Sequence, residues 1–463
     1  MEIEEDKCLI NSLPDELLAF CLQNVDAYHL LHEVPRVCTR WNKLARDRLV
    51  WKKTGIYFDG SRKNDNSYVG SFIKLLNEVP YLGVLDISEV AVRVIDVASH
   101  DEFEPRLTHV TETLNSDSGA NFCRNIGLSS LHSSAYFEGL CELLLSNQNT
   151  LTCVKLHDVQ LGHPLEWADY GMFYELEKMK STLSGVMEAV KNLPKLKELT
   201  LVFCEVWEYG AFKQWYEEMD RIVYTAVLQI FSLKRLRLVH ARPLIESVPS
   251  PPPHSFWQLS SLEIVGESYF SDKLAAQFVS AARGTLRVFK SGHERVPRTM
   301  KVLGQCENLQ VLDLPGLENN IYLKDLKKLH SLKIFSLREN YNVNVNAQCI
   351  LKLNFLKNLR RLALIVVGDP HEADIILTII SQCQQLRTFI LSEYQFPLRP
   401  RPFIHLAPKV VKSIVDGALP ELHTFDVRSG ADKEEWKEPL SVLKEHRPSL
   451  NILTEPVYLR LRS

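Results

Sequence analysis

The chain has 463 residues, of which 45% are hydrophobic and 24% are charged, a composition typical of a globular protein. Its 54 Lys and Arg residues nearly balance its 57 Asp and Glu residues. The resulting net charge of -3 creates no field that would attract the whole chain to nucleic acid or to an anionic membrane. We therefore expect no nucleic-acid and no membrane partner, and we expect partners to be recognised by local surfaces.

Three features of the sequence predict the cellular setting. The ten cysteines form no C-x-x-C pair and no Cys/His cluster with the spacing of a zinc site. The first ten residues, MEIEEDKCLI, are acidic and lack the basic start and apolar run of a secretory signal. The longest apolar stretch, Leu362 to Val367, is too short to cross a bilayer. We expect a reduced intracellular protein, in the cytoplasm, the nucleus or both, with no metal and no cofactor.

The first 55 residues carry three short helical patterns. Pro14, Asp15 and Glu16 begin the first helix, where proline costs no hydrogen bond and acidic residues favour the helix dipole. Asp26 is the expected N-cap of a second helix, DAYHLLHEV. Pro35 ends that helix and begins a third, which we expect to run through RVCTRWNKLARDRLVW. Helices this small bury little surface alone, so a partner that covers their apolar side is physically favourable.

The run LPDELL, followed by Leu30, VCTRW and the sequence LVW at residues 49–51, resembles the F-box family. The resemblance covers residues 12 to about 55 and implies a three-helix F-box within residues 1–58. It also implies binding to a Skp-type adaptor and, through it, to a cullin-RING ubiquitin ligase. Cys21 and Pro35 depart from the residues that the family more often has at these positions. The adaptor-binding residues that the resemblance implies are Leu13, Pro14, Leu17, Leu18, Leu30, Val37, Cys38, Trp41, Leu44 and Trp51. The alternative is a helical cap for the domain that follows.

A second pattern recurs after a polar linker at residues 59–74, which is rich in turn-forming residues. Between residues 75 and 463 the motif Leu-x-x-Leu-x-Leu returns with aliphatic or aromatic replacements. Its first positions are Leu82, Leu151, Leu196, Leu233, Leu259, Leu309, Leu332, Leu359, Leu386 and Leu422, with a degenerate copy at Leu286 and a terminal half-copy at Leu450.

These copies resemble leucine-rich repeats, because most of the steps from Leu196 onward lie within the 20 to 29 residues of that family. Each copy is expected to form a short strand and to return by a helix or a loop. Two such helices are visible, one around Phe278 and one around Ile379. We therefore predict an α/β fold: a curved leucine-rich-repeat solenoid with parallel strands on its concave face and helices on its convex face. Insertions are expected near residues 160–190, 205–230, 243–256 and 394–408, and residues 88–150 are the least regular stretch.

Three groups of side chains are candidates for holding a substrate protein. An aromatic segment follows the Leu196 copy, and aromatic residues commonly anchor interfaces, although these rings have the alternative role of covering the solenoid's apolar flank. A proline-rich basic loop is suited to acidic or phosphorylated peptide. Charged strand positions form a mixture that favours a protein over a phosphate backbone. The candidates are Trp207, Tyr209, Trp215, Tyr216, Arg235, Arg237, Lys290, Arg399 and Arg401.

The chain has no phosphate-binding loop, no H-E-x-x-H and no G-x-S-x-G motif, so we expect no catalytic activity. The leading hypothesis is a non-enzymatic substrate receptor of an SCF-type ubiquitin ligase. A second hypothesis is a leucine-rich-repeat scaffold or inhibitor that binds a protein without causing its modification. A third, an enzyme with a cryptic catalytic domain, would need more residues than the F-box and the repeats leave over.

Overall fold

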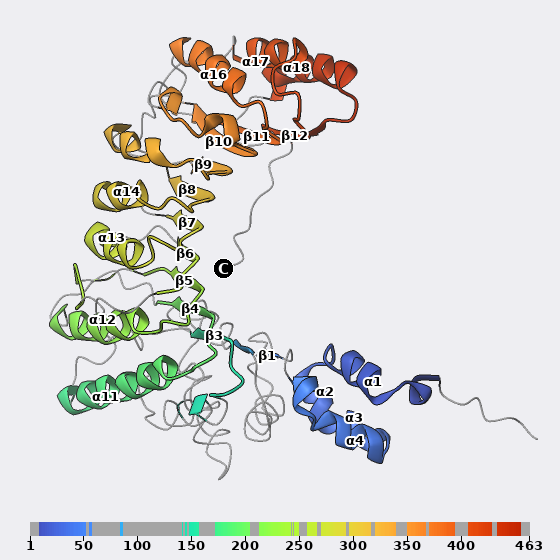
Figure 1. Ribbon diagram of the computed structural model, residues 1–463, viewed down its shortest axis with the longest axis vertical. Coiled ribbons are helices and arrows are strands. Elements are labelled where there is room, and N and C mark those ends of the chain that lie inside the picture. Colours follow the sequence, from blue (N-terminus) through green and yellow to red (C-terminus); the bar gives the residue numbers. More distant parts are fainter. Residues whose placement is uncertain are drawn as a thin grey trace, which may run out of the picture. The chain divides into compact units, whose positions relative to one another are not determined.

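The computed structural model in Figure 1 divides into two compact units, Met1–Pro251 and Pro252–Ser463. The structure describes residues 9–51, 55–57, 84–86, 141, 144–145, 148–156, 172–203, 213–241, 243, 245–249, 257–265, 270–292, 296–315, 320–338, 350–366, 370–393, 406–427 and 433–454.

The first unit begins with a module of one 3-10 helix and five short α-helices, where the sequence predicts three short helices. Its elements are the 3-10 helix η1 (Leu9–Ser12) and the α-helices α1 (Asp15–Leu22), α2 (Ala27–His32), α3 (Val34–Val37), α4 (Thr39–Ala45) and α5 (Arg48–Trp51).

The described strands of the first unit run parallel and pair in sequence order. Their α-helical connections α11 and α12 lie on one side of the strands (Figure 1). The segments 160–190 and 205–230, expected to be insertions, contain these two helices, which therefore connect neighbouring strands. The elements are β1 (Gly55–Tyr57), β2 (Val84–Asp86), β3 (Cys153–Leu156), α11 (Met172–Lys191), β4 (Glu198–Val202), α12 (Lys213–Leu228) and β5 (Arg235–Val239).

The second unit repeats this arrangement, with parallel strands in sequence order and helices between them. Figure 1 shows α13 and α14 on the same side of β6, β7 and β8. The elements are β6 (Ser261–Val265), α13 (Asp272–Ala281), β7 (Val288–Ser291), α14 (Pro297–Leu303), β8 (Val311–Pro315), η5 (Asn320–Lys328), β9 (Ile334–Arg338), η6 (Leu356–Asn358), β10 (Arg361–Val366), α16 (Pro370–Gln382), β11 (Thr388–Glu393), α17 (Leu406–Val415), β12 (Thr424–Asp426), α18 (Lys433–His446) and β13 (Asn451–Leu453).

The recurring leucine motif sets the register of the second unit. The second position of each copy pairs with the second position of the next, and all of these side chains are buried because alternate residues of a strand face the same side. These residues are Leu262, Phe289, Leu312, Phe335, Leu362, Phe389 and Phe425. Within the row, the rings of Phe389 and Phe425 stack with centroids 5.6 Å apart. The α/β class and the parallel strands expected from the sequence are thus confirmed.

Both ends of the strand series differ from the expectation. The sequence pattern does not reveal β1, which lies inside residues 1–58 and pairs with β2. At the other end, Ile452 pairs with Phe425, whereas the motif predicts Leu453 at that position. A terminal strand has a neighbour on one side alone, so a single ladder determines its register.

The two connecting helices expected from apolar spacing are confirmed. Helix α13 buries Leu274, Phe278 and Val279, and helix α16 buries Ile379 and Ile380. Ser271 caps α13 by accepting a hydrogen bond from the Leu274 amide at 3.3 Å. Among the described residues, no helix combines the length and the apolar character needed to cross a membrane.

Candidate functional site

The helical module at residues 9–51 exposes several large apolar side chains, and its local sequence explains its helices. Helix α1 begins directly after Pro14, with Asp15 and Glu16 in its first turn. Asp26 caps α2 as expected, since its carboxylate accepts a hydrogen bond from the His29 amide at 3.1 Å.

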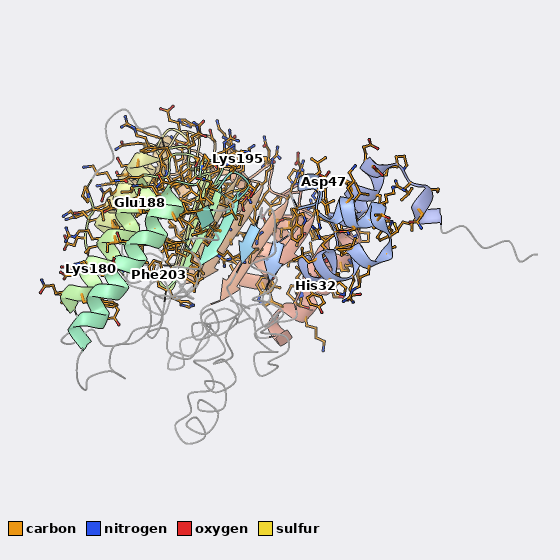
Figure 2. All side chains as sticks on the ribbon, turned by 90° about the horizontal axis from the view of Figure 1, so that it is seen from below. His32, Asp47, Lys180, Glu188, Lys195 and Phe203 are labelled. Atoms are coloured by element: carbon orange, nitrogen blue, oxygen red, sulfur yellow. The ribbon has the colours of Figure 1, made fainter. Side chains whose placement is uncertain are left out.

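The third helix expected from the sequence is instead divided into α3, α4 and α5. Cys38 is extended, with φ -165° and ψ 173°, and ends α3 before α4 begins. Asp47, labelled in Figure 2, accepts a hydrogen bond from the Leu49 amide at 2.7 Å and so starts α5. The aspartate in ARDRL is a capping residue that the apolar spacing of Trp41, Leu44 and Ala45 concealed.

Several predicted adaptor-binding residues form the core of this module. Leu18, Leu30, Leu44 and Trp51 have buried side chains. The indole of Trp51 also donates a 2.7 Å hydrogen bond to the carbonyl of Ala45, which joins α5 to the end of α4. These four side chains support the fold, and they are not available as contact residues in the folded module because almost none of their surface meets solvent.

Other predicted residues lie on the surface of the module. Pro14, Leu17, Val37 and Cys38 are exposed, and the exposed fractions of Leu17 and Val37 are 53% and 54%. Leu13 and Trp41 are half-buried. The exposed Leu17 and Val37 side chains on so small a module are suited to contact with another protein.

Further exposed apolar residues, which the sequence pattern did not indicate, are Phe20 at 58%, Tyr28 at 41% and Leu49 at 60%. Leu17 and Phe20 are three residues apart on α1, so they lie on the same side of that helix. The sequence signal for the exposure of Phe20 is its position away from the side of α1 that carries the buried Leu18 and Leu22. We call the exposed residues Pro14, Leu17, Phe20, Val37 and Cys38 the exposed apolar set.

Arg40 binds the segment at residues 11–15, in which the exposed apolar set begins. Its Nε donates to the carboxylate of Asp15 at 2.6 Å, and its terminal nitrogens donate to the carbonyls of Asn11, at 2.7 Å, and Leu13. The neighbouring indole of Trp41 donates to the side chain of Asn11 at 2.9 Å. Helix α4 therefore holds the Leu13 and Pro14 backbone against the module through a planar guanidinium fork.

Replacing Arg40 with alanine is expected to weaken adaptor binding about fivefold, because loss of charge-assisted hydrogen bonds worth about 1 kcal/mol loosens the Leu13 and Pro14 segment. Arg40→Lys keeps the charge but not the fork and should give most of the same loss. Calorimetric titration with the adaptor measures both variants. Wild-type affinity in Arg40→Ala would contradict this positioning role.

The candidate substrate residues on the strands differ in their pairing. Arg235 lies 3.2 Å from Glu198 on the adjacent strand, and Lys290 lies 3.0 Å from Glu263. Arg237 is exposed on β5, in register with Thr200. The structure brings Arg235 and Arg237 together on one strand, but Lys290 belongs to the other unit.

The aromatic and basic loop candidates have different outcomes. The side chain of Tyr216 is fully buried in α12, so it is a core residue and not the contact residue expected from the sequence. Trp215 is half-buried, and its ring packs edge-to-face against Tyr216 with the ring centroids 4.9 Å apart. The remaining predicted residues, Trp207, Tyr209, Arg399 and Arg401, lie outside the described residues.

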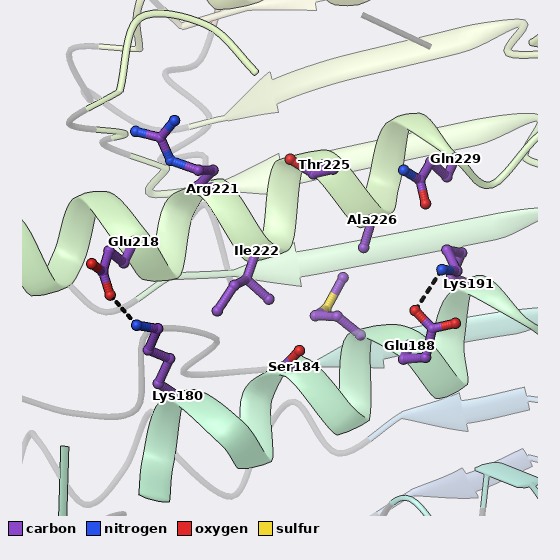
Figure 3. A pocket seen from close by; sticks show the side chains of 11 residues that line it. Lys180, Ser184, Glu188, Lys191, Glu218, Arg221, Ile222, Thr225, Ala226 and Gln229 are labelled. Atoms are coloured by element: carbon purple, nitrogen blue, oxygen red, sulfur yellow. Dashed lines mark hydrogen bonds and ion pairs between the residues drawn. The ribbon is translucent and has the colours of Figure 1, made fainter. Parts of the chain in front are cut away.

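A crevice of about 460 Å³ lies between α11 and α12 (Figure 3). Two of its lysines are neutralised by carboxylates, Lys180 by Glu218 and Lys191 by Glu188. The hydrogen bond from Lys191, with a smaller effect of Asn192, lowers the pKa of Glu188 below its usual value. Figure 2 shows Lys180 and Glu188 on the same helix, α11. The third cation of the lining is Arg221, so the crevice carries three basic side chains against two carboxylates.

No cluster of three or more His, Cys, Asp or Glu side chains that could hold a metal ion occurs among the residues that the structure describes. The described cysteines differ in exposure, and Cys141 and Cys153 are half-buried. Cys21 and Cys38 are exposed on the helical module, whereas Cys306 and Cys383 are buried in the second unit. Burial raises the pKa of both buried thiols to about 12, because a thiolate loses its hydration there.

We expect iodoacetamide to modify Cys21 and Cys38 at pH 8 and to leave Cys306 and Cys383 unmodified. The thiolate reacts, and a thiol pKa near 12 leaves only about 0.01% thiolate at this pH. Because both pKa values are raised, the protection should persist until the pH approaches 12 or the protein unfolds. Mass spectrometry of the alkylated peptides measures each site. Fast labelling of Cys306 in the native protein would contradict its placement in the core.

Comparison with known families addresses the helical module alone. Residues 10–56 match the family described as F-box-like. No curated protein matches the chain. The match runs from within η1 through α5 and reaches into β1, so it coincides with the module that carries the exposed apolar set. Residues 10–56 are thus an F-box-like domain, which supports a relation of this chain to the F-box family.

Proposed function

We propose that the chain is the substrate-recognition subunit of an SCF-type ubiquitin ligase. The F-box-like domain would bind a Skp-type adaptor, and the adaptor would connect it to a cullin-RING scaffold. The observation that carries the proposal is the exposed apolar set, in which Leu17, Phe20 and Val37 are each more than half exposed in an F-box-like domain. Such apolar surface is unfavourable in water and becomes favourable when a partner covers it.

The rest of the chain would act as a leucine-rich-repeat solenoid that holds the substrate protein. Parallel strands in sequence order, motif copies in register and helices on one side of the strands support this assignment. The rigid backbone ladder would present side chains of several strands to one partner. In this role the chain is not catalytic, because ubiquitin transfer would occur on other subunits, and it acts inside the cell, where that machinery resides.

Affinity capture of the full chain from cells, with quantification of adaptor and cullin, tests the proposal. We expect both proteins in stoichiometric amounts. The alternative, a scaffold or inhibitor that does not cause degradation, predicts a captured partner without cullin. Recovery of neither adaptor nor cullin would overturn the ligase assignment.

A further inference from the structure

In the second unit, one residue before each strand is joined by its backbone to the equivalent residue of the next strand. The amides of Gln310, Lys333, Arg360 and Arg387 each donate a 2.8 Å hydrogen bond to the carbonyl of the preceding member, beginning with Arg287. These five residues, which we call the basic row, therefore lie side by side across β7 to β11. Their backbone is fixed by the ladder, so the row is a rigid feature of the fold.

The basic row concentrates positive charge. Arg287, Lys333, Arg360 and Arg387 are all exposed. Arg387 lies 3.4 Å from Glu421, but within the described part of the chain no carboxylate forms an ion pair with the other three cations. Adjacent strands are about 4.8 Å apart, so Lys333 and Arg360 are one strand spacing apart and Arg287 is about 10 Å from Lys333. Such closely spaced cations favour an anionic partner.

Directly beside the basic row lies an apolar stripe formed by Val288, Val311 and Ile334. These residues pair in register on β7, β8 and β9, and each is half-buried. In each strand, the stripe residue directly precedes the fully buried second residue of the motif. Neighbouring residues of a strand face opposite sides, so the stripe lies on the side of the strands opposite to the buried row. Three adjacent β-branched side chains on an open strand face offer a dry contact to another protein.

Two residues after the stripe, on the same side of β7 and β8, the side chains carry charges of both signs. Lys290 pairs with Glu263 at 3.0 Å and is in register with Asp313. The apolar stripe offers the bases of a nucleic acid no aromatic ring for stacking. An extended protein segment suits the row and the stripe, because a protein can present both carboxylates and apolar side chains to them.

We propose that the basic row and the apolar stripe bind an extended acidic segment of the substrate protein, with carboxylates against the row and apolar side chains over the stripe. The inference rests on the proposed function, since it names the class of substrate that the repeats would hold. The row extends over four strand spacings, about 19 Å, which matches about six residues of extended chain. Recognition would weaken with added salt, because exposed ion pairs are screened.

The test uses the full chain in complex with its adaptor and a fluorescein-labelled ten-residue peptide in which Glu alternates with Val. We expect Lys333→Glu with Arg360→Glu to weaken peptide binding at least about tenfold, because two attractions become repulsions. The matched control is Lys301→Glu with Lys412→Glu, which makes a similar charge change at exposed positions on α14 and α17. Replacing Val311 and Ile334 by threonine should weaken binding several-fold through the stripe alone.

Loss of peptide binding in the row variant, with the control unaffected, supports the proposal. It is overturned by an equal loss in the control, by unchanged binding in the row variant, by absence of wild-type binding, or by tighter binding of a single-stranded oligonucleotide of equal charge. Adaptor capture is measured on the same preparations. If the row fails this test while the adaptor is retained, the ligase assignment stands and the acidic substrate class does not.

Discussion

Replacing both Leu17 and Val37 with alanine is expected to reduce adaptor affinity by about a hundredfold without unfolding the helical module. Both side chains are more than half exposed, so alanine removes apolar surface that would be covered in a complex and not in the free protein. Covering a leucine and a valine is worth about 3 kcal/mol in total, which corresponds to about two orders of magnitude in affinity. Titration calorimetry measures the affinity, and thermal unfolding should show no change.

The matched control is Leu145→Ala with Val442→Ala, which truncates the same residue types at exposed positions outside the F-box-like domain. This control should bind the adaptor normally. Replacing Leu13 and Pro14 is a less specific experiment, because Leu13 is half-buried and the Arg40 guanidinium holds its carbonyl. Unchanged adaptor binding by the Leu17 and Val37 double variant would remove the main support for the proposed function.

Deletion of residues 386–463 is expected to cause aggregation of the chain that remains. It removes β11, which pairs with β10 over six residues, together with α17 and α18. The unpaired edge of β10 and the apolar side of α16 would then face water, and an open strand edge promotes pairing between chains. Light scattering after size-exclusion chromatography measures the assembly state, and thermal unfolding measures the stability.

A shorter deletion, of residues 451–463, serves as the control. It removes β13, whose side chains are exposed or half-buried, and it leaves the buried Leu450 in place. We expect a monomer with a modest loss of stability. A monomeric product of the longer deletion with an undiminished unfolding transition would contradict a continuous series of strands stabilised by neighbours.

The sequence alone determined the strands and their register from β2 to β5 in the first unit and from β6 to β12 in the second. Alternate residues of a strand face the same side, so apolar residues that recur at the second motif position all lie on the buried side of the strands. Leu312 and Phe335, which are paired and buried, are examples. It also determined the cap of α2, because an aspartate before a helix satisfies a free amide locally. These features depend on contacts between near neighbours in the chain or on a simple repeat.

Only the tertiary structure decided which apolar residues are surfaces and which are core. Leu17 and Leu18 are adjacent, and one is 53% exposed whereas the other is fully buried, because burial depends on how α1 packs against α4 and α5. The basic row has the same origin. Arg287, Lys333 and Arg360 are separated by 46 and 27 residues in the sequence, and parallel pairing of β7 to β10 places them within a few strand spacings. The leucine positions of the motif determine this pairing. The charge of the basic row comes from residues directly before the strands, whose identity the motif does not specify.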